Sequence, residues 1–95
     1  MNWTLIKEKC PKAFKKLKQD RPFDYHQHPR DLYDFFDEQG IYIEILKMFD
    51  GNYTTPTGFY FYIDDYTRDE YSADTRTLAE EQAFLKSFEI LEDKL

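Results

Sequence analysis

The sequence predicts a small α+β domain in which helices pack on one face of a two- or three-stranded antiparallel sheet, in the order α-α-β-β-(β)-α. Three observations predict this class. Apolar residues recur at helical spacing near both ends of the chain, they alternate at strand spacing in the middle, and turn-forming residues separate the two middle segments. A chain of 95 residues has the length of one domain, which we expect to span residues 1–95.

The first helical pattern covers the N-terminal segment. Pro11 interrupts it, because a proline inside a helix removes a backbone donor and clashes with the preceding turn. We therefore expect either a kinked helix or two short helices joined at Cys10, with Pro11 as the first residue of the second one. The apolar stripe of this segment consists of Trp3, Ile6, Cys10, Ala13, Phe14 and Leu17.

A loop and a short helix are predicted next. Residues 19–30 contain two prolines and follow neither the helical nor the strand period, which indicates a loop. Residues 30–40 predict a helix with Leu32, Phe35 and Phe36 on one face. Gly40 is placed to end this helix in a left-handed conformation.

Two strands are predicted in the middle of the chain, at residues 41–49 and 58–64. Both are rich in β-branched and aromatic residues, and a turn at residues 50–52 makes an antiparallel hairpin the simplest pairing. A short third strand around Glu70 to Ala73 would cover an otherwise open edge. One face of the hairpin carries Ile41, Ile43, Ile45, Phe49, Phe59, Phe61 and Ile63.

The C-terminal segment predicts a long helix that lies across the sheet. Thr77 and Glu80 have the spacing of a capping box, in which the hydroxyl and the carboxylate satisfy free amides at a helix start. The apolar stripe of this helix consists of Phe84, Phe88, Leu91 and Leu95, flanked by Ala83 and Ile90.

The second face of the predicted sheet is apolar where a one-sided antiparallel sheet shows polar groups. It carries Tyr42, Leu46, Met48, Tyr60 and Tyr62. Because Tyr and Met are enriched at protein interfaces, the leading hypothesis is a non-catalytic protein-binding or regulatory module. It would contact a protein partner or a second copy in a homodimer through this face. The alternative is that a helix or residues 19–30 fold over the face.

The net charge of −6 is unevenly distributed. Residues 1–30 hold eight Lys and Arg against three Asp and Glu, and residues 31–95 hold five against sixteen. The acidic majority argues against direct binding of nucleic acid. One alternative function is an acidic decoy that mimics nucleic acid and binds a host protein. Another possibility is that the basic segment lies against the acidic half of this chain or of a second copy. Its lysines are Lys7, Lys9, Lys12, Lys15, Lys16 and Lys18.

Residues that could carry chemistry are few. Asp24, His26 and His28 alternate in the predicted loop and could reach one zinc or nickel ion, but no fourth ligand is evident. Cys10 lies on an apolar stripe, which favours a buried and inert thiol. We expect no catalytic residue, no metal site and no cofactor, and we rank a small hydrolase or metal-binding protein last. An acidic run without the EF-hand order predicts a solvated turn and comprises Asp64, Asp65, Asp69, Glu70 and Asp74.

The single cysteine excludes an internal disulfide framework, and lysines interleaved with the first apolar residues argue against a signal peptide or membrane association. The two ends of the chain are NWTLIKEKCPKAFKKLK at residues 2–18 and TRTLAEEQAFLKSFEILEDKL at residues 75–95. Together they resemble short, uncharacterised proteins carried by bacteriophages and mobile elements of gut bacteria. The resemblance implies a bacterial host and a cytoplasmic location, and it implies no particular activity.

Overall fold

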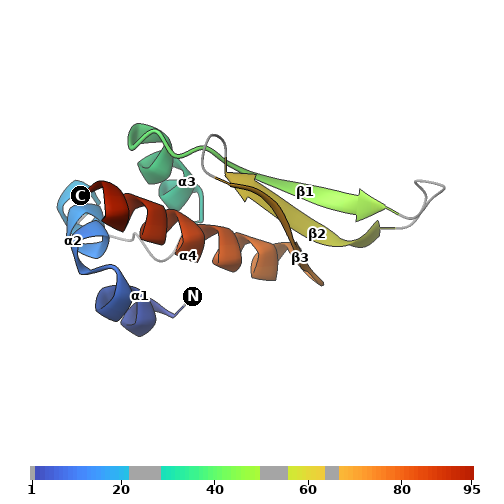
Figure 1. The fold of residues 1–95 in the computed structure, drawn as a ribbon, viewed down its shortest axis with the longest axis horizontal. Coiled ribbons are helices and arrows are strands. Elements are labelled where there is room, and N and C mark those ends of the chain that lie inside the picture. Colours follow the sequence, from blue (N-terminus) through green and yellow to red (C-terminus); the bar gives the residue numbers. More distant parts are fainter. Residues whose placement is uncertain (1, 22–28, 50–55, 64–66) are drawn as a thin grey trace.

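The computed structural model describes residues 2–21, 29–49, 56–63 and 67–95. The elements follow in the order α1 (Trp3–Lys9), α2 (Pro11–Asp20), α3 (Pro29–Glu38), β1 (Ile43–Phe49), β2 (Pro56–Ile63), β3 (Thr67–Ala73) and α4 (Arg76–Lys94). The strands form an antiparallel sheet in the order β1-β2-β3, with α4 along one of its faces and the other helices near one end (Figure 1). The predicted α+β class is confirmed.

The N-terminal segment forms two short helices that meet at Cys10, which is one of the two predicted arrangements. Cys10 serves both helices: its N–H donates to the carbonyl of Ile6 at 2.8 Å, and its own carbonyl accepts from the N–H of Phe14 at 2.9 Å. Pro11 is the first residue of α2, as predicted. The predicted apolar stripe is confirmed, since its buried members are Ile6, Cys10, Ala13, Phe14 and Leu17, while Trp3 packs against the core.

The loop predicted at residues 19–30 is too long at both ends. α2 continues through Asp20, whose carboxylate lies 3.4 Å from the Nζ of Lys16 one turn earlier. α3 begins at Pro29, because the fixed backbone of proline suits the first position of a helix. Residues 22–28 lie outside the described residues.

The end of α3 follows the prediction. Gly40 has a φ of +77°, and its N–H donates to the carbonyl of Asp37 at 3.0 Å. The N–H of Ile41 donates to the carbonyl of Phe36 at 2.8 Å. This pair of bonds is the Schellman motif, in which a left-handed residue lets the chain turn back on the last helical turn. The buried face of α3 consists of Leu32, Phe35 and Phe36, as predicted.

β1 and β2 form the predicted antiparallel pair, and β3 supplies the third strand next to β2. The β1–β2 register shifts between Met48 and Phe49, where Phe49 opposes Pro56. Proline has no N–H for the ladder, so it is tolerated at this irregular end of the strand. Gly58 has a φ of +152°, and a Cβ there would lie 3.0 Å from the carbonyl oxygen of Ala73. The turn predicted at residues 50–52 lies outside the described residues.

α4 starts two residues before the predicted position, and the prediction that Thr77 caps it is wrong. The N-cap is Thr75, whose Oγ1 accepts from the N–H of Leu78 at 3.1 Å. Thr75 has the extended backbone that an N-cap requires, with a φ of −131° and a ψ of 158°, whereas Thr77 already lies inside the helix. The chain therefore enters α4 almost directly from the end of β3 at Ala73.

α4 contacts all three strands, as predicted for a helix lying across the sheet. Leu95 departs from the predicted stripe because it follows the last helical residue, and it is 49% exposed. Ser87 is the one buried polar side chain among the described residues, and its hydroxyl donates to the carbonyl of Ala83 at 2.8 Å. The remaining buried members of α4 are Ala79, Ala83, Phe84, Phe88 and Leu91.

Polar contacts between distant residues hold the helical end together. α2 has no capping side chain of its own, and the N–H of Ala13 in its first turn donates to Oε1 of Glu92 on α4 at 2.9 Å. A carboxylate suits this place because the start of a helix carries free amides and a partial positive charge. Arg21 after α2 pairs with Glu38 of α3 at 2.7 Å.

Candidate functional site

The two faces of the sheet have different surroundings. On the face toward α4, Phe61 and Ile63 of β2 are almost completely buried, and Ile43 and Ile45 of β1 pack against the same core. Their alternation with the intervening residues follows from the strand period of two. This is the first of the two faces predicted from the sequence, and it forms the core.

The opposite face contains residues that the sequence predicts as a binding surface. Leu46 opposes Tyr60, and Glu44 opposes Tyr62, so these four side chains share one face. Leu46, Tyr60 and Tyr62 are half-buried, and the core cluster of the described residues includes none of them. No described helix lies on this face (Figure 1). We call Leu46, Tyr60 and Tyr62 the open sheet face.

The two other residues of the predicted surface have different positions. Tyr42 lies just before β1 and is 51% exposed, the largest exposed fraction among the exposed large hydrophobic residues of the described chain. Met48 opposes Gly58 in the ladder, and its side chain lies outside the described residues. The structure thus brings Leu46, Tyr60 and Tyr62 together and places Tyr42 at the entrance to β1.

The chemistry of the open sheet face suits contact with another molecule. Tyrosine rings offer a large apolar surface together with a hydroxyl that can donate or accept a hydrogen bond. Glu44 beside Tyr62 adds one exposed carboxylate. The face therefore offers apolar contact, hydroxyl groups and one carboxylate for recognition of another molecule.

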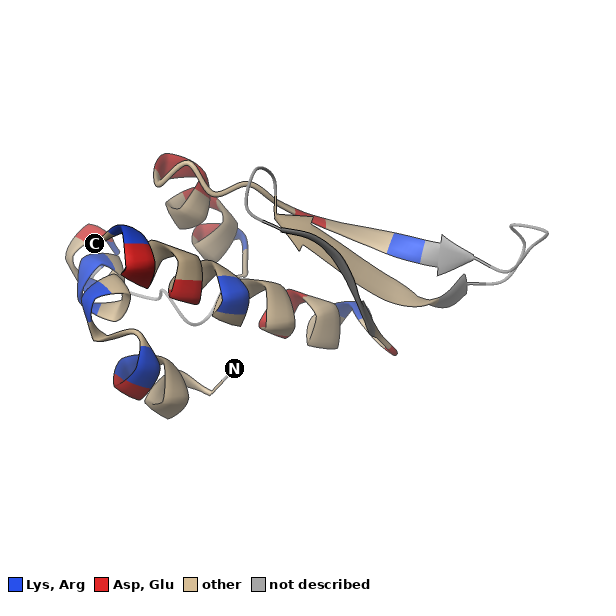
Figure 2. Cartoon of the chain, viewed as in Figure 1, with Lys and Arg blue, Asp and Glu red and all other residues tan. Residues whose placement is uncertain are grey.

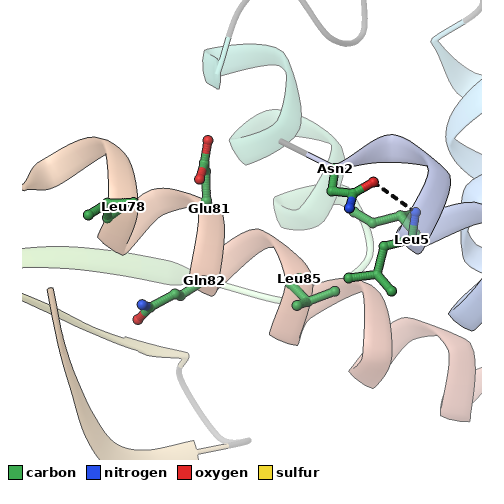
Figure 3. Close-up of a pocket in the computed structure, with 7 residues that line it drawn as sticks. Asn2, Leu5, Leu78, Glu81, Gln82 and Leu85 are labelled. Carbon is green, nitrogen blue, oxygen red and sulfur yellow. Dashed lines mark hydrogen bonds between the residues drawn. The ribbon is translucent and has the colours of Figure 1, made fainter.

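A hollow of about 270 Å³ opens between α1 and α4, and Figure 3 shows the side chains that line it. Leu5 projects from α1, and Leu78 and Leu85 project from α4 (Figure 3). The side chain of Asn2 is engaged in capping α1, where its Oδ1 accepts from the N–H of Leu5 at 3.1 Å. The described lining contains one carboxylate, that of Glu81, and the amides of Asn2 and Gln82, and its other side chains are apolar.

Cys10 has the environment of an unreactive thiol. Its side chain is 1% exposed, and burial raises its pKa to about 11, with a smaller contribution from the charges of Glu92 and Glu89. The nucleophile is the thiolate, so a thiol that stays protonated at neutral pH reacts slowly. The prediction that Cys10 is buried is confirmed.

Most of the residues predicted as metal ligands or as the acidic run belong to the parts of the chain outside the described residues. Asp24, His26, His28, Asp64 and Asp65 lie outside the described residues, as do the side chains of Asp69 and Glu70, whereas Asp74 is exposed. Within the described ranges, no group of three or more His, Cys, Asp or Glu residues could hold a metal ion.

In the same ranges, no helix is both long and apolar enough to cross a bilayer.

A second surface is formed by lysines of α1 and α2, and the sequence predicts it only in part. Lys7 of α1 and Lys18 of α2 place their Nζ atoms 5.3 and 5.9 Å from the ring centre of Phe14. With Lys15 they line an open hollow of about 530 Å³ beside Pro11. The three-residue spacing of Lys15 and Lys18 predicts that they lie on one side of a helix. The proximity of Lys7 to them could not be predicted from spacing, because it depends on the angle between α1 and α2 at Cys10.

A scan against models of known protein families found no match, and searches of curated proteins and of solved structures found none either. The resemblance of the two chain ends to phage and mobile-element proteins therefore stays a prediction.

Proposed function

We propose that the protein is a non-catalytic binding module that contacts a protein partner through the open sheet face. One observation supports this proposal above the others. α4 lies on the Phe61 face of the sheet, and no described helix covers Leu46, Tyr60 and Tyr62, which lie half-buried on adjacent strands. Large apolar side chains gathered on an uncovered face are typical of interaction sites.

The energetics of the face favour association. Covering the remaining apolar surface contributes roughly 25 cal/mol per Å² removed from water, and tyrosine is over-represented among the residues that dominate binding energies. Because Tyr60 and Tyr62 lie outside the core cluster, their rings contribute more to a complex than to the isolated fold. Their removal should therefore affect binding more strongly than folding.

The test is capture of a partner from a bacterial lysate by the tagged protein, at physiological salt and at about 1 M salt. The informative variant is Tyr60→Thr with Tyr62→Thr, because threonine retains a preference for strands while it removes both rings. The matched control is Leu78→Gln, which removes an apolar side chain that is 45% exposed on α4, away from the open sheet face.

A partner retained by Leu78→Gln and lost by the tyrosine double variant supports the proposal. A partner that the double variant still captures contradicts it.

The acidic decoy remains the alternative proposal, supported by the excess of acidic residues after residue 30. A partner that is released by high salt and is indifferent to the two tyrosines would favour the decoy, because salt screens contacts between exposed charges.

A further inference from the structure

The charges of the helices are separated by element. α1 and α2 together carry six lysines against Glu8 and Asp20, a net charge of +4. α3 carries Arg30 against four carboxylates, a net charge of −3. Figure 2 shows these basic and acidic helices at the same end of the molecule, away from the end at which β1 stops. Helices of opposite charge thus lie at one end of the molecule, where Arg21 after α2 pairs with Glu38 of α3.

The basic surface is not neutralised by the rest of the described chain. Lys7, Lys15 and Lys18 line one open hollow, and none of them forms an ion pair with a described residue. The Nζ atoms of Lys7 and Lys18 stay near the Phe14 ring, which attracts cations through its electron-rich face. Within the described ranges, these three lysines therefore have no carboxylate of their own chain in an ion pair. We call them the basic patch.

The acidic surface also lacks compensation. Asp34 and Asp37 are exposed one turn apart on α3, and neither forms an ion pair with a described residue. Partial burial and the negative charge of Asp34 raise the pKa of Asp37 above its usual value. Asp37 also lies in the last turn of α3, which contains no basic residue and where the helix dipole disfavours negative charge. We call Asp34 and Asp37 the acidic patch.

We propose that two copies of this chain associate through their helical ends, with the basic patch of each protomer against the acidic patch of the other. A two-fold axis at this end sets each patch against its opposite in both directions, so one symmetric contact satisfies both. The proposal is independent of the open sheet face, which would remain free in such a dimer.

A second copy fits these patches better than a nucleic acid does. The acidic patch lies at the same end as the basic patch, and the whole chain carries −6, so a long polyanion would be repelled. A second copy brings a carboxylate pair for the lysines and lysines for the carboxylates. Its contacts are between exposed charges, which makes the association sensitive to salt.

The test is the solution mass of the purified protein by analytical ultracentrifugation, at about 0.1 M and about 1 M salt, where charges are screened beyond about 10 Å and about 3 Å. Wild-type protein should approach twice the 11.6 kDa of one chain at low salt and high protein concentration. It should return to a single chain at high salt.

Two charge-reversal variants identify the contact. Lys15→Glu with Lys18→Glu makes both patches acidic, and Asp34→Lys with Asp37→Lys makes both basic, so each variant alone should stay monomeric. An equimolar mixture should associate, because the reversed residues of each variant then face residues of opposite charge in the other. Their net charges would be −10 and −2, each four charges from the wild-type −6. Because both variants are negative overall, attraction between opposite net charges cannot explain association of the mixture.

Two control variants and an unfolding curve for each protein complete the design. Lys47→Glu with Lys86→Glu also gives −10 but changes lysines outside the basic patch, and it should dimerise like the wild type. The tyrosine double variant should dimerise too. A wild-type chain that stays at 11.6 kDa under all conditions, or a mixture of reversed variants that stays monomeric, overturns the proposal. Dimerisation lost in the tyrosine variant would also overturn it and would place the contact on the open sheet face.

Discussion

At the scale of single residues, Cys10 shows how burial sets chemical behaviour. Its backbone joins α1 to α2, and its thiol lies in the core with a pKa raised to about 11 by burial and by nearby carboxylates. The free energy of folding is therefore linked to the protonation of this thiol.

The linkage predicts a loss of stability in alkaline solution. The unfolded thiol titrates near 9.0 and the folded one near 11, so between these pH values the unfolded state binds fewer protons and the free energy of unfolding falls as pH rises. Between about pH 8 and about pH 10.5, the wild type should lose roughly 1 to 2 kcal/mol more than Cys10→Ala, as measured by urea unfolding. Equal losses in both proteins would show that the thiol is not buried.

The position of Cys10 on an apolar stripe was enough to predict that it is buried. The cause of its high pKa was only partly predictable, because Glu89 and Glu92 approach it from the far end of the chain. The same limit applies to the hydrogen bond between Ala13 and Glu92, which are 79 residues apart. Contacts of this kind require the packing of α2 on α4, and a local pattern does not contain that information.

At the scale of the elements, the start of α4 provides the sharpest comparison. Thr75 and Thr77 are both suitable N-cap residues, and the structure places the cap at Thr75. Thr75→Ala should lower the free energy of unfolding by about 1 kcal/mol, because the N–H of Leu78 loses its partner. Thr77 lies on the exposed side of the first turn of α4. Thr77→Ala should therefore change the free energy of unfolding by less than about 0.5 kcal/mol.

Urea unfolding of the two alanine variants checks this order, with the wild type as reference. The reverse order would mean that α4 begins at the predicted capping box. The pattern from Thr77 to Glu80 misled the prediction because it matches the box, whereas Thr75 has leucine at the corresponding place. The sequence does not show where β3 ends, and that end determines which threonine still has an extended backbone.

At the scale of the whole molecule, the described residues show two separations. One sheet face is covered by α4 while no described helix lies on the other, and the basic helices are distinct from the acidic one. The sequence predicts both sets of strand side chains, because alternation with a period of two is a local property. It cannot decide which set the helices cover, because both sets are large and apolar. The charge imbalance was countable from the sequence, yet the meeting of Lys7 with Lys15 and Lys18 depends on the bend between α1 and α2.

The most direct test of the central claim compares the two sheet faces within one strand. Phe61 lies between Tyr60 and Tyr62 and points to the opposite face, so Phe61→Thr is a matched control for Tyr60→Thr with Tyr62→Thr. The measurement is the free energy of unfolding in urea for both variants at low protein concentration.

Phe61→Thr should cost about 3 to 5 kcal/mol, because it leaves a cavity in the core. The tyrosine double variant should cost less, about 1 to 2 kcal/mol, since both half-buried rings lie outside the core cluster of the described residues. This result would leave the open sheet face available for a partner. A double variant as unstable as Phe61→Thr would show that the tyrosines belong to the core and would contradict the account.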